Sequence, residues 1–185
     1  SYWAEKNNVD PNNIYCVSVM PCIAKKSELK REEFKVNGIC DVDCSITTRE
    51  LARMIRMYGL DFVNLPDEAF DQPLGEYSGA GTIFGATGGV MEAALRTAQD
   101  ILTCQDLPKI EFEAVRGGNG IKRATVNIDG KEIKVVTASG LGNAQKIMEE
   151  IKSGEADYQF VEIMACPGGC IMGGGQPIKN SKTLA

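Results

Sequence analysis

The chain has 185 residues, of which 43% are hydrophobic and 24% are charged, so it can bury a substantial core. Acidic residues outnumber basic ones by 25 to 20, and the net charge of −5 argues against a surface that binds nucleic acid. The sequence contains seven cysteines and no histidine, which leaves thiolates and carboxylates as the ligands for any metal site.

The first half of the chain contains one predicted strand and one predicted helix. Residues 14–20 form a β-branched apolar run that ends at Pro21, which predicts a buried strand leading into a loop. Residues 47–59 predict an amphipathic helix, because a capping hydroxyl precedes the apolar stripe and a glycine follows it. Residues 63–81 contain prolines, acidic residues and glycines, and they predict an irregular connection.

The second half contains a predicted hairpin and a last strand. Residues 124–128 and 131–137 alternate with period two on either side of Asp129-Gly130, which predicts a β-hairpin with a type I′ turn. Residues 158–164 predict a strand that leads directly into a cysteine segment. Because strands alternate with helices along the chain, we expect an α/β fold.

Two further helices are predicted in the second half, each with one apolar face. The first runs from about residue 89 to 102, and the second from about residue 143 to 152, where Gly154 ends it. The expected inward face of the first helix consists of Val90, Ala94, Leu95 and Leu102. The expected inward face of the second consists of Ala144, Ile147, Met148 and Ile151.

The cysteine usage and the ends of the chain indicate a reduced compartment. No apolar run approaches the ~20 residues that cross a bilayer, and the start of the chain lacks the pattern of a signal peptide. The odd number and uneven spacing of the cysteines argue against a disulfide framework. The chain opens at Ser1, inside what reads as the end of a helix, so we expect a piece of a longer protein.

The segment at residues 162–177 reads Glu-Ile-Met-Ala-Cys-Pro-Gly-Gly-Cys-Ile-Met-Gly-Gly-Gly-Gln-Pro. Cys166 and Cys170 are four residues apart among five glycines, which favours an iron–sulfur site because glycine lets backbone N–H groups approach inorganic sulfide. One alternative is a glycine-rich turn with two incidental cysteines. A zinc site is another, although its nearest second pair, Cys40 and Cys44, lies in an acidic, extended segment.

The segment at residues 20–28 reads Met-Pro-Cys-Ile-Ala-Lys-Lys-Ser-Glu. Cys22 is a possible anionic metal ligand near the cation of Lys25, and Glu28 can pair with that cation and keep it charged. The alternative is a solvated start of a helix. Both cysteine segments follow the carboxyl end of a predicted strand, where open α/β sheets usually bind ligands.

Together these segments resemble the large subunit of iron-only ([FeFe]) hydrogenases. Residues 20–28 match the second signature stretch of its H-cluster domain, and residues 162–177 match the third. Residues 81–96 are also similar to this family, and the resemblance runs from residue 2 to residue 177. It implies an α/β fold with mixed sheets flanked by helices, in which residues 1–185 form part of the H-cluster domain.

The resemblance also implies an H-cluster and assigns its ligands. Cys22, Cys166 and Cys170 would ligate a [4Fe–4S] cluster, and Cys170 would link it to a di-iron centre with CO, cyanide and azadithiolate ligands. Lys25 would donate to a cyanide ligand, with Glu28 as its partner. The walls of the di-iron pocket would be formed by Met20, Pro21, Phe84 and Met164.

One family signature, a Thr-Ser-Cys-Cys-Pro stretch, is absent from the sequence. In the family it supplies the fourth cluster thiolate and a cysteine that transfers protons, so we expect an internal fragment that is inactive in isolation. The remaining cysteines match no family ligand. We expect Cys16 to be a buried strand residue, Cys104 to lie in the core at a helix end, and Cys40 and Cys44 to be incidental.

The function implied by the resemblance is the reversible reaction 2H⁺ + 2e⁻ ⇌ H₂. The implied partners are ferredoxin or an NAD(P)-linked electron-transfer subunit, together with H-cluster maturation proteins, and the implied location is the cytoplasm of an anaerobic bacterium. Two alternatives are a cytosolic iron–sulfur cluster assembly factor and a sensory hydrogenase of low turnover. Residues 85–94 and the pair Met20 and Met164 favour a hydrogenase over the assembly factor.

Overall fold

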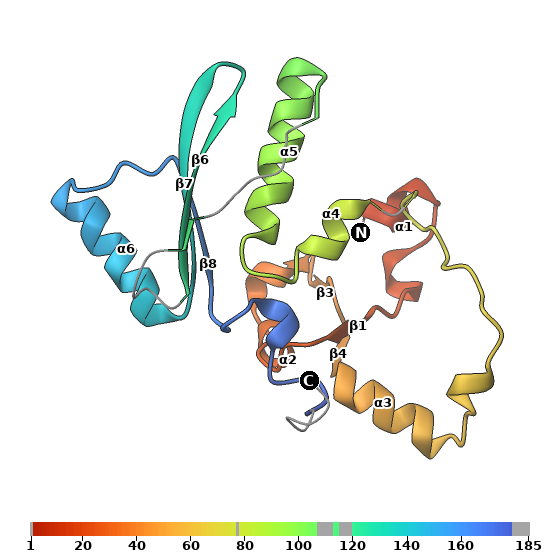
Figure 1. Ribbon diagram of the computed structural model, residues 1–185. Coiled ribbons are helices and arrows are strands. Elements are labelled where there is room, and N and C mark those ends of the chain that lie inside the picture. Colours follow the sequence, from red (N-terminus) through yellow and green to blue (C-terminus); the bar gives the residue numbers. More distant parts are fainter. Residues whose placement is uncertain (1, 77, 107–112, 115–119, 179–185) are drawn as a thin grey trace. The chain divides into compact units, whose positions relative to one another are not determined.

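The computed structural model describes residues 2–76, 78–106, 113–114 and 120–178. The chain forms two compact units (Figure 1). The first unit comprises residues 1–77 and 173–185, and the second comprises residues 78–172. Among the described residues, no helix is long and apolar enough to cross a membrane.

The first unit is built around a short parallel pair of strands, β1 and β4, in which Val17 lies opposite Cys44 and Met20 opposite Thr47. The strand predicted at residues 14–20 is confirmed over Val17–Met20, and it ends where proline removes a backbone donor. Its predicted burial is wrong, because Val17 and Val19 are 48% and 43% exposed. The elements of this unit are α1 (Tyr2–Lys6), η1 (Pro11–Asn13), β1 (Val17–Met20), α2 (Lys25–Glu28), η2 (Glu32–Phe34), β2 (Lys35–Val36), β3 (Ile39–Cys40), β4 (Cys44–Thr47), α3 (Thr48–Met57) and η3 (Phe62–Asn64).

A capping box begins α3 directly at the end of β4. The hydroxyl of Thr47 accepts the backbone N–H of Glu50, and the Glu50 carboxylate accepts the backbone N–H of Thr47 at 2.8 Å. The same carboxylate accepts a hydrogen bond from the ammonium of Lys26 in α2, with an N–O distance of 2.5 Å. One side chain therefore starts α3 and connects it to α2. The helix predicted at residues 47–59 is confirmed.

The second unit contains a four-stranded sheet in the order β5-β6-β7-β8. Strands β6 and β7 form the predicted hairpin, and Asp129 and Gly130 have φ values of 49° and 77°, as a type I′ turn requires. Strand β8 runs parallel to β7, which makes the sheet mixed and confirms the expected α/β class. The elements are α4 (Gly79–Ile83), α5 (Gly89–Thr103), β5 (Glu113–Ala114), β6 (Ile121–Ile128), β7 (Lys131–Ser139), α6 (Leu141–Ser153), β8 (Phe160–Met164) and η4 (Cys170–Met172).

Helices α5 and α6 lie on opposite sides of the β6–β7 hairpin (Figure 1). Adjacent residues of a strand point to opposite faces, so Val135 packs beneath α5 and Val136 beneath α6. The core on the α5 side consists of Met91, Leu95, Val126, Ile128 and Val135. The core on the α6 side consists of Ile121, Val136, Ala138 and Ile147.

The two helices were correctly located by periodicity, but their predicted inward faces were partly wrong. Val90 and Leu102 are 38% and 61% exposed, and Met91 is buried instead. In α6, Ile147 is buried, whereas Met148 and Ile151 are largely exposed. Both helices carry more apolar residues than one face can hold, so the sheet decides which of them is covered. Of the irregular connection predicted at residues 63–81, residues 65–76 and 78 lie outside helices and strands, whereas η3 covers its start and α4 its end.

We predict that truncating Ile147 destabilises the second unit far more than truncating its neighbour. Ile147→Ala opens a cavity between α6 and the sheet and should lower the free energy of unfolding by about 2–5 kcal/mol. Met148→Ala, on the exposed side of the same helix, should change it by about 0.5 kcal/mol or less. Denaturant unfolding of both variants measures the difference, and equal losses would contradict this packing.

We predict that Glu50 gives the folding free energy a defined dependence on pH. The Lys26 ammonium, followed by the two Thr47 donors, lowers the pKa of Glu50 from 4.5 to about 2. Since the folded state binds this proton more weakly than the unfolded state, the stabilisation is complete above pH 4.5 and is lost as the pH falls towards 2.

The test compares the wild-type chain with Glu50→Gln in denaturant unfolding across this range of pH. The difference in unfolding free energy between the two proteins should shrink progressively as the solution is acidified. A difference that stays constant down to pH 2 would show that the carboxylate is not held in its charged form by these donors.

Candidate functional site

The residues predicted to form the site fall into two groups, one in each unit. In both groups a strand ends and a cysteine follows within two residues. The group in the first unit consists of Met20, Pro21, Cys22, Lys25 and Glu28. The group in the second unit consists of Phe84, Met164, Cys166 and Cys170.

The first group spans the turn from β1 into α2. Met20 is the last residue of β1, Cys22 is half-buried in the turn, and Lys25 begins the helix. The ammonium of Lys25 forms an ion pair with the Glu28 carboxylate one turn later, as the sequence suggested. Their side chains are 45% and 30% exposed, so the pair contributes little to stability and both charges are accessible to a ligand.

Two hollows adjoin this ion pair. One, of about 160 Å³, has Met20, Leu29 and Phe34 among its lining residues. The other, of about 290 Å³, is more open and includes Cys22. Lys25 and Glu28 line both, so the charged pair stands between the thioether of Met20 and the thiol of Cys22.

The end of the segment at residues 162–177 supports this turn from within the first unit. The backbone N–H of Gly175 donates to the Pro21 carbonyl at 2.7 Å, and the Arg49 guanidinium donates to the Gly174 carbonyl at 2.6 Å. A Cβ at Gly175 would lie 2.8 Å from the Thr47 side chain, so only glycine fits. The segment that contains Cys170 thus also makes a hydrogen bond to the turn that contains Cys22.

The second group surrounds the loop that follows β8. Ile171 donates its N–H to the Gly85 carbonyl at 2.8 Å, and Thr87 donates to the Gly168 carbonyl at 3.2 Å. Gly169 has a φ of +102°, and a Cβ there would lie 2.5 Å from the Gly85 carbonyl oxygen. Glycine is therefore required at residue 169, because two backbones meet without room for a side chain.

The side chains of the second group differ in exposure. Met164 is buried at the end of β8, and Cys166 is half-buried. Cys170 is exposed at the start of η4, and Phe84 is 47% exposed. In neither unit do the described residues gather three or more Cys, Asp or Glu side chains closely enough to hold a metal ion.

Glu162 is a functional candidate to which the sequence analysis gave no role. It is buried in β8, and its carboxylate accepts the backbone N–H groups of Gly88 at 2.5 Å and Met91 at 2.8 Å. These groups lie at the N-terminus of α5, where backbone donors lack partners within the helix. The available signal was a lone carboxylate in an apolar strand, but its partners lie more than seventy residues away.

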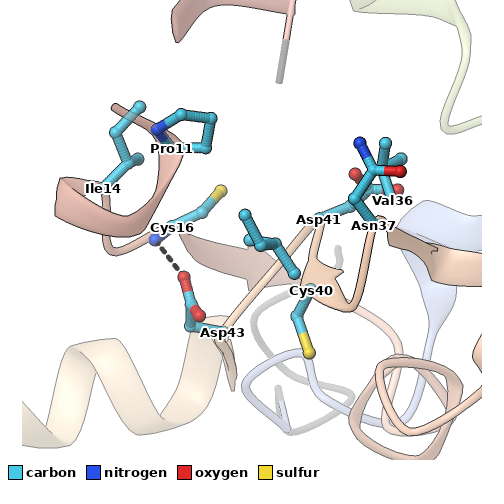
Figure 2. A pocket seen from close by; sticks show the side chains of 9 residues that line it. Pro11, Ile14, Cys16, Val36, Asn37, Cys40, Asp41 and Asp43 are labelled. Carbon is cyan, nitrogen blue, oxygen red and sulfur yellow. Dashed lines mark hydrogen bonds between the residues drawn. The ribbon is translucent and has the colours of Figure 1, made fainter. Parts of the chain in front are cut away.

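All seven cysteines are described, and all are free thiols. Two of the expectations for the non-ligand cysteines were wrong, because both residues are exposed. Cys16 precedes β1, and its N–H donates to the Asp43 carboxylate at 2.7 Å (Figure 2). Cys104 ends α5 in the left-handed region with a φ of 52°, which turns it away from the core.

Cys16 and Cys40 line the same small hollow of about 90 Å³ in the first unit. Figure 2 shows their thiols pointing in different directions. Cys44 is half-buried in β4, opposite Val17. The expectation that Cys40 and Cys44 are incidental stays a prediction.

Comparison with known proteins identifies close relatives of this chain. It is 50% identical over 178 residues to the periplasmic [Fe] hydrogenase large subunit of Nitratidesulfovibrio vulgaris, which covers 96% of the chain and 42% of that protein. It is 51% identical over 177 residues to the NADP-reducing hydrogenase subunit HndD of Solidesulfovibrio fructosivorans, covering 96% and 30%. The chain thus spans less than half the length of these relatives.

A second class of relatives is more distant. Protein NAR1 of Arabidopsis thaliana is 35% identical over 179 residues, which covers 89% of the chain and 38% of that protein. Among solved structures, the apo [FeFe]-hydrogenase HydA1 variant C377H from Chlamydomonas reinhardtii matches with a TM-score of 0.82 and 39% identity. That match covers all of the chain and 53% of the solved chain.

The family model described as the iron-only hydrogenase large subunit, C-terminal domain, matches residues 1–174. This range contains both cysteine turns, the ion pair between Lys25 and Glu28, and Glu162. The fold agrees as well, since the solved hydrogenase structure superimposes on the whole chain. The chain belongs to the family of iron-only hydrogenase large subunits.

Proposed function

We propose that the protein containing this chain is an [FeFe] hydrogenase that catalyses 2H⁺ + 2e⁻ ⇌ H₂, and that residues 1–185 are part of its H-cluster domain. The observation that carries the proposal is the accessible pair of Lys25 and Glu28 beside Cys22, in a chain that retains the two cysteine motifs of the family. A charged donor next to a half-buried thiol suits an anionic metal group.

The proposed cofactor ligands are Cys22, Cys166 and Cys170, which would hold a [4Fe–4S] cluster. The donor chemistry fits, because all three are free thiols in turns that follow strands, and thiolates are the usual ligands of such clusters. Cys170 would also connect the cluster to a di-iron centre with CO, cyanide and azadithiolate ligands. When bound, this cofactor would pass on electrons from the partner protein and provide the metal at which protons and H₂ are interconverted.

Lys25 is proposed to donate a hydrogen bond to a cyanide ligand of that centre. An ammonium is a strong donor to an anionic group, and the Glu28 carboxylate forms an ion pair with it. The ion pair also orients the Lys25 side chain, since it joins two positions one helical turn apart. Loss of the ammonium should therefore weaken retention and polarisation of the cofactor.

The remaining site residues are proposed as walls of the di-iron pocket. Met20 and Met164 end their strands with thioethers, which are polarizable and do not take up protons at neutral pH. Pro21 and Phe84 would contribute apolar surface beside them. Such a wall would exclude water, so that protons reach the di-iron centre only through ionisable groups.

The proposed electron partners are ferredoxin or an NAD(P)-linked subunit, and the cofactor would be inserted by maturation proteins. The relative from Solidesulfovibrio fructosivorans is named as an NADP-reducing hydrogenase subunit, which supports the second type of partner. We propose the bacterial cytoplasm as the location, although the relative from Nitratidesulfovibrio vulgaris is named as periplasmic.

The second candidate function is that of a cytosolic iron–sulfur cluster assembly factor. NAR1-type relatives cover the same region of the chain, which gives this candidate its support. The identity of 35% to Protein NAR1 is lower than the 50% to the hydrogenase subunit, and this difference favours hydrogen chemistry. A sensory hydrogenase would share the pocket residues and differ in its turnover.

We predict that Cys170→Ser and Lys25→Ala each abolish H₂ evolution by the full-length, cofactor-loaded parent protein under anaerobic conditions. The first removes a thiolate ligand, and the second removes the donor beside the cofactor. Cys104→Ser and Lys30→Ala are the matched controls, since both change exposed residues outside the two groups. Wild-type turnover in Cys170→Ser or Lys25→Ala would refute the assignment.

We further predict that infrared spectra of the loaded parent contain the stretching bands of metal-bound CO and cyanide. These ligands belong to the di-iron centre, which an assembly factor lacks, so the bands separate the two candidate functions. Lys25→Ala should shift a cyanide band, because it removes the hydrogen bond to that ligand, whereas Lys30→Ala should not. A parent that shows a [4Fe–4S] signal but no such bands would favour the assembly factor.

A further inference from the structure

We propose that Glu162 is a positioning residue, whose carboxylate holds the turn at residues 84–88 against the loop that carries Cys166 and Cys170. The inference rests on the proposed function, because it concerns the environment of the cofactor ligands. It goes beyond it by assigning a role to a residue that would not itself contact the cofactor.

The first step is the unusual environment of the carboxylate. Glu162 is only 9% exposed, and its two oxygen atoms accept the backbone N–H groups of Gly88 and Met91. A buried carboxylate is costly unless it is well bonded, and these donors also lie at the positive end of the α5 dipole. Charge, burial and geometry therefore combine to fix the start of α5 on β8.

The second step connects this contact to the cysteine loop. The turn just before Gly88 makes two backbone hydrogen bonds to that loop, from Ile171 to the Gly85 carbonyl and from Thr87 to the Gly168 carbonyl. Because Gly169 allows the two backbones to meet directly, movement of the turn is transmitted to the loop without an intervening flexible side chain. Glu162 therefore acts on the loop through the turn.

The third step places the same carboxylate beside a predicted pocket wall. Residues two apart on a strand share a face, so Glu162 and Met164 point to the side of the sheet that α5 covers. Phe84 is the first residue of the turn that Glu162 fixes. One carboxylate thus fixes the backbone beside both pocket residues of this unit and beside Cys170.

The test uses two variants, one that removes the charge of the side chain and one that shortens it. Glu162→Gln keeps the size of the side chain, but its NH₂ group cannot accept, so one buried N–H loses its acceptor and the other keeps only a neutral one. Glu162→Asp keeps the charge but is one methylene shorter and cannot reach both donors. Thr137→Val is the packing control, because Thr137 lies opposite Glu162 and its buried hydroxyl has no hydrogen-bond partner in the described chain. Glu155→Gln, at an exposed position, is the charge control.

Two measurements are made on the full-length parent protein. Amide hydrogen exchange reports the contact itself, and we expect protection at Gly88 and Met91 to fall by about 10-fold or more in both Glu162 variants. Electron paramagnetic resonance of the [4Fe–4S] cluster and infrared spectra of the CO ligands report the cofactor environment. We expect both spectra to shift in the Glu162 variants and to remain as in wild type in the two controls.

Each outcome decides the proposal. Reduced protection together with shifted spectra, in the Glu162 variants alone, supports it. Unchanged protection refutes the contact, and reduced protection with unchanged spectra shows that Glu162 only stabilises the fold. A wild-type parent that binds no cofactor overturns the proposed function instead, and this failure is distinguishable because the exchange measurement needs no cofactor. If Glu162→Gln does not fold, Glu162→Asp provides the same comparison.

Discussion

Among the described residues of the second unit, one buried carboxylate connects the sheet to helix α5. The Glu162 carboxylate joins the end of β8 to the start of α5, and these are the elements from which the cysteine loop and the turn at residues 84–88 extend. Without it, the donors at the start of α5 would be buried beside an apolar strand with no acceptor, which is unfavourable. Gly169 lies against the backbone of the same turn, where a side chain would not fit.

The first unit uses the same arrangement at its surface. There the Glu50 carboxylate accepts from the start of α3 and from Lys26, and the turn containing Cys22 lies just before α2. In the first unit the carboxylate reaches the helix after the cysteine turn through Lys26, whereas in the second unit the carboxylate lies four residues before Cys166 in the chain. The difference is burial, since the Glu50 side chain is 45% exposed whereas Glu162 is almost completely covered.

Local features of the sequence were sufficient to predict the elements that carry the motifs. Strand ends at Met20 and Met164, the hairpin turn at Asp129-Gly130 and the helix start at Thr47 depend on residues within a few positions of one another. The covered faces of α5 and α6 and the exposure of Cys16 and Cys104 were mispredicted, because they depend on which surfaces meet in three dimensions. The partners of Glu162 could not be predicted for the same reason. No local pattern connects residues so distant in the chain.

The contact between Gly85 and Ile171 has a consequence for the order in which the second unit folds. It joins residues that are 86 positions apart in the chain, so its closure costs more chain entropy than the β6–β7 hairpin or the short crossover through α6. The hairpin and the parallel strand β8 should therefore be in place before the two loop backbones meet. The loop that carries two of the candidate ligands would then be the last part of this unit to become ordered, after the sheet that supports it has formed.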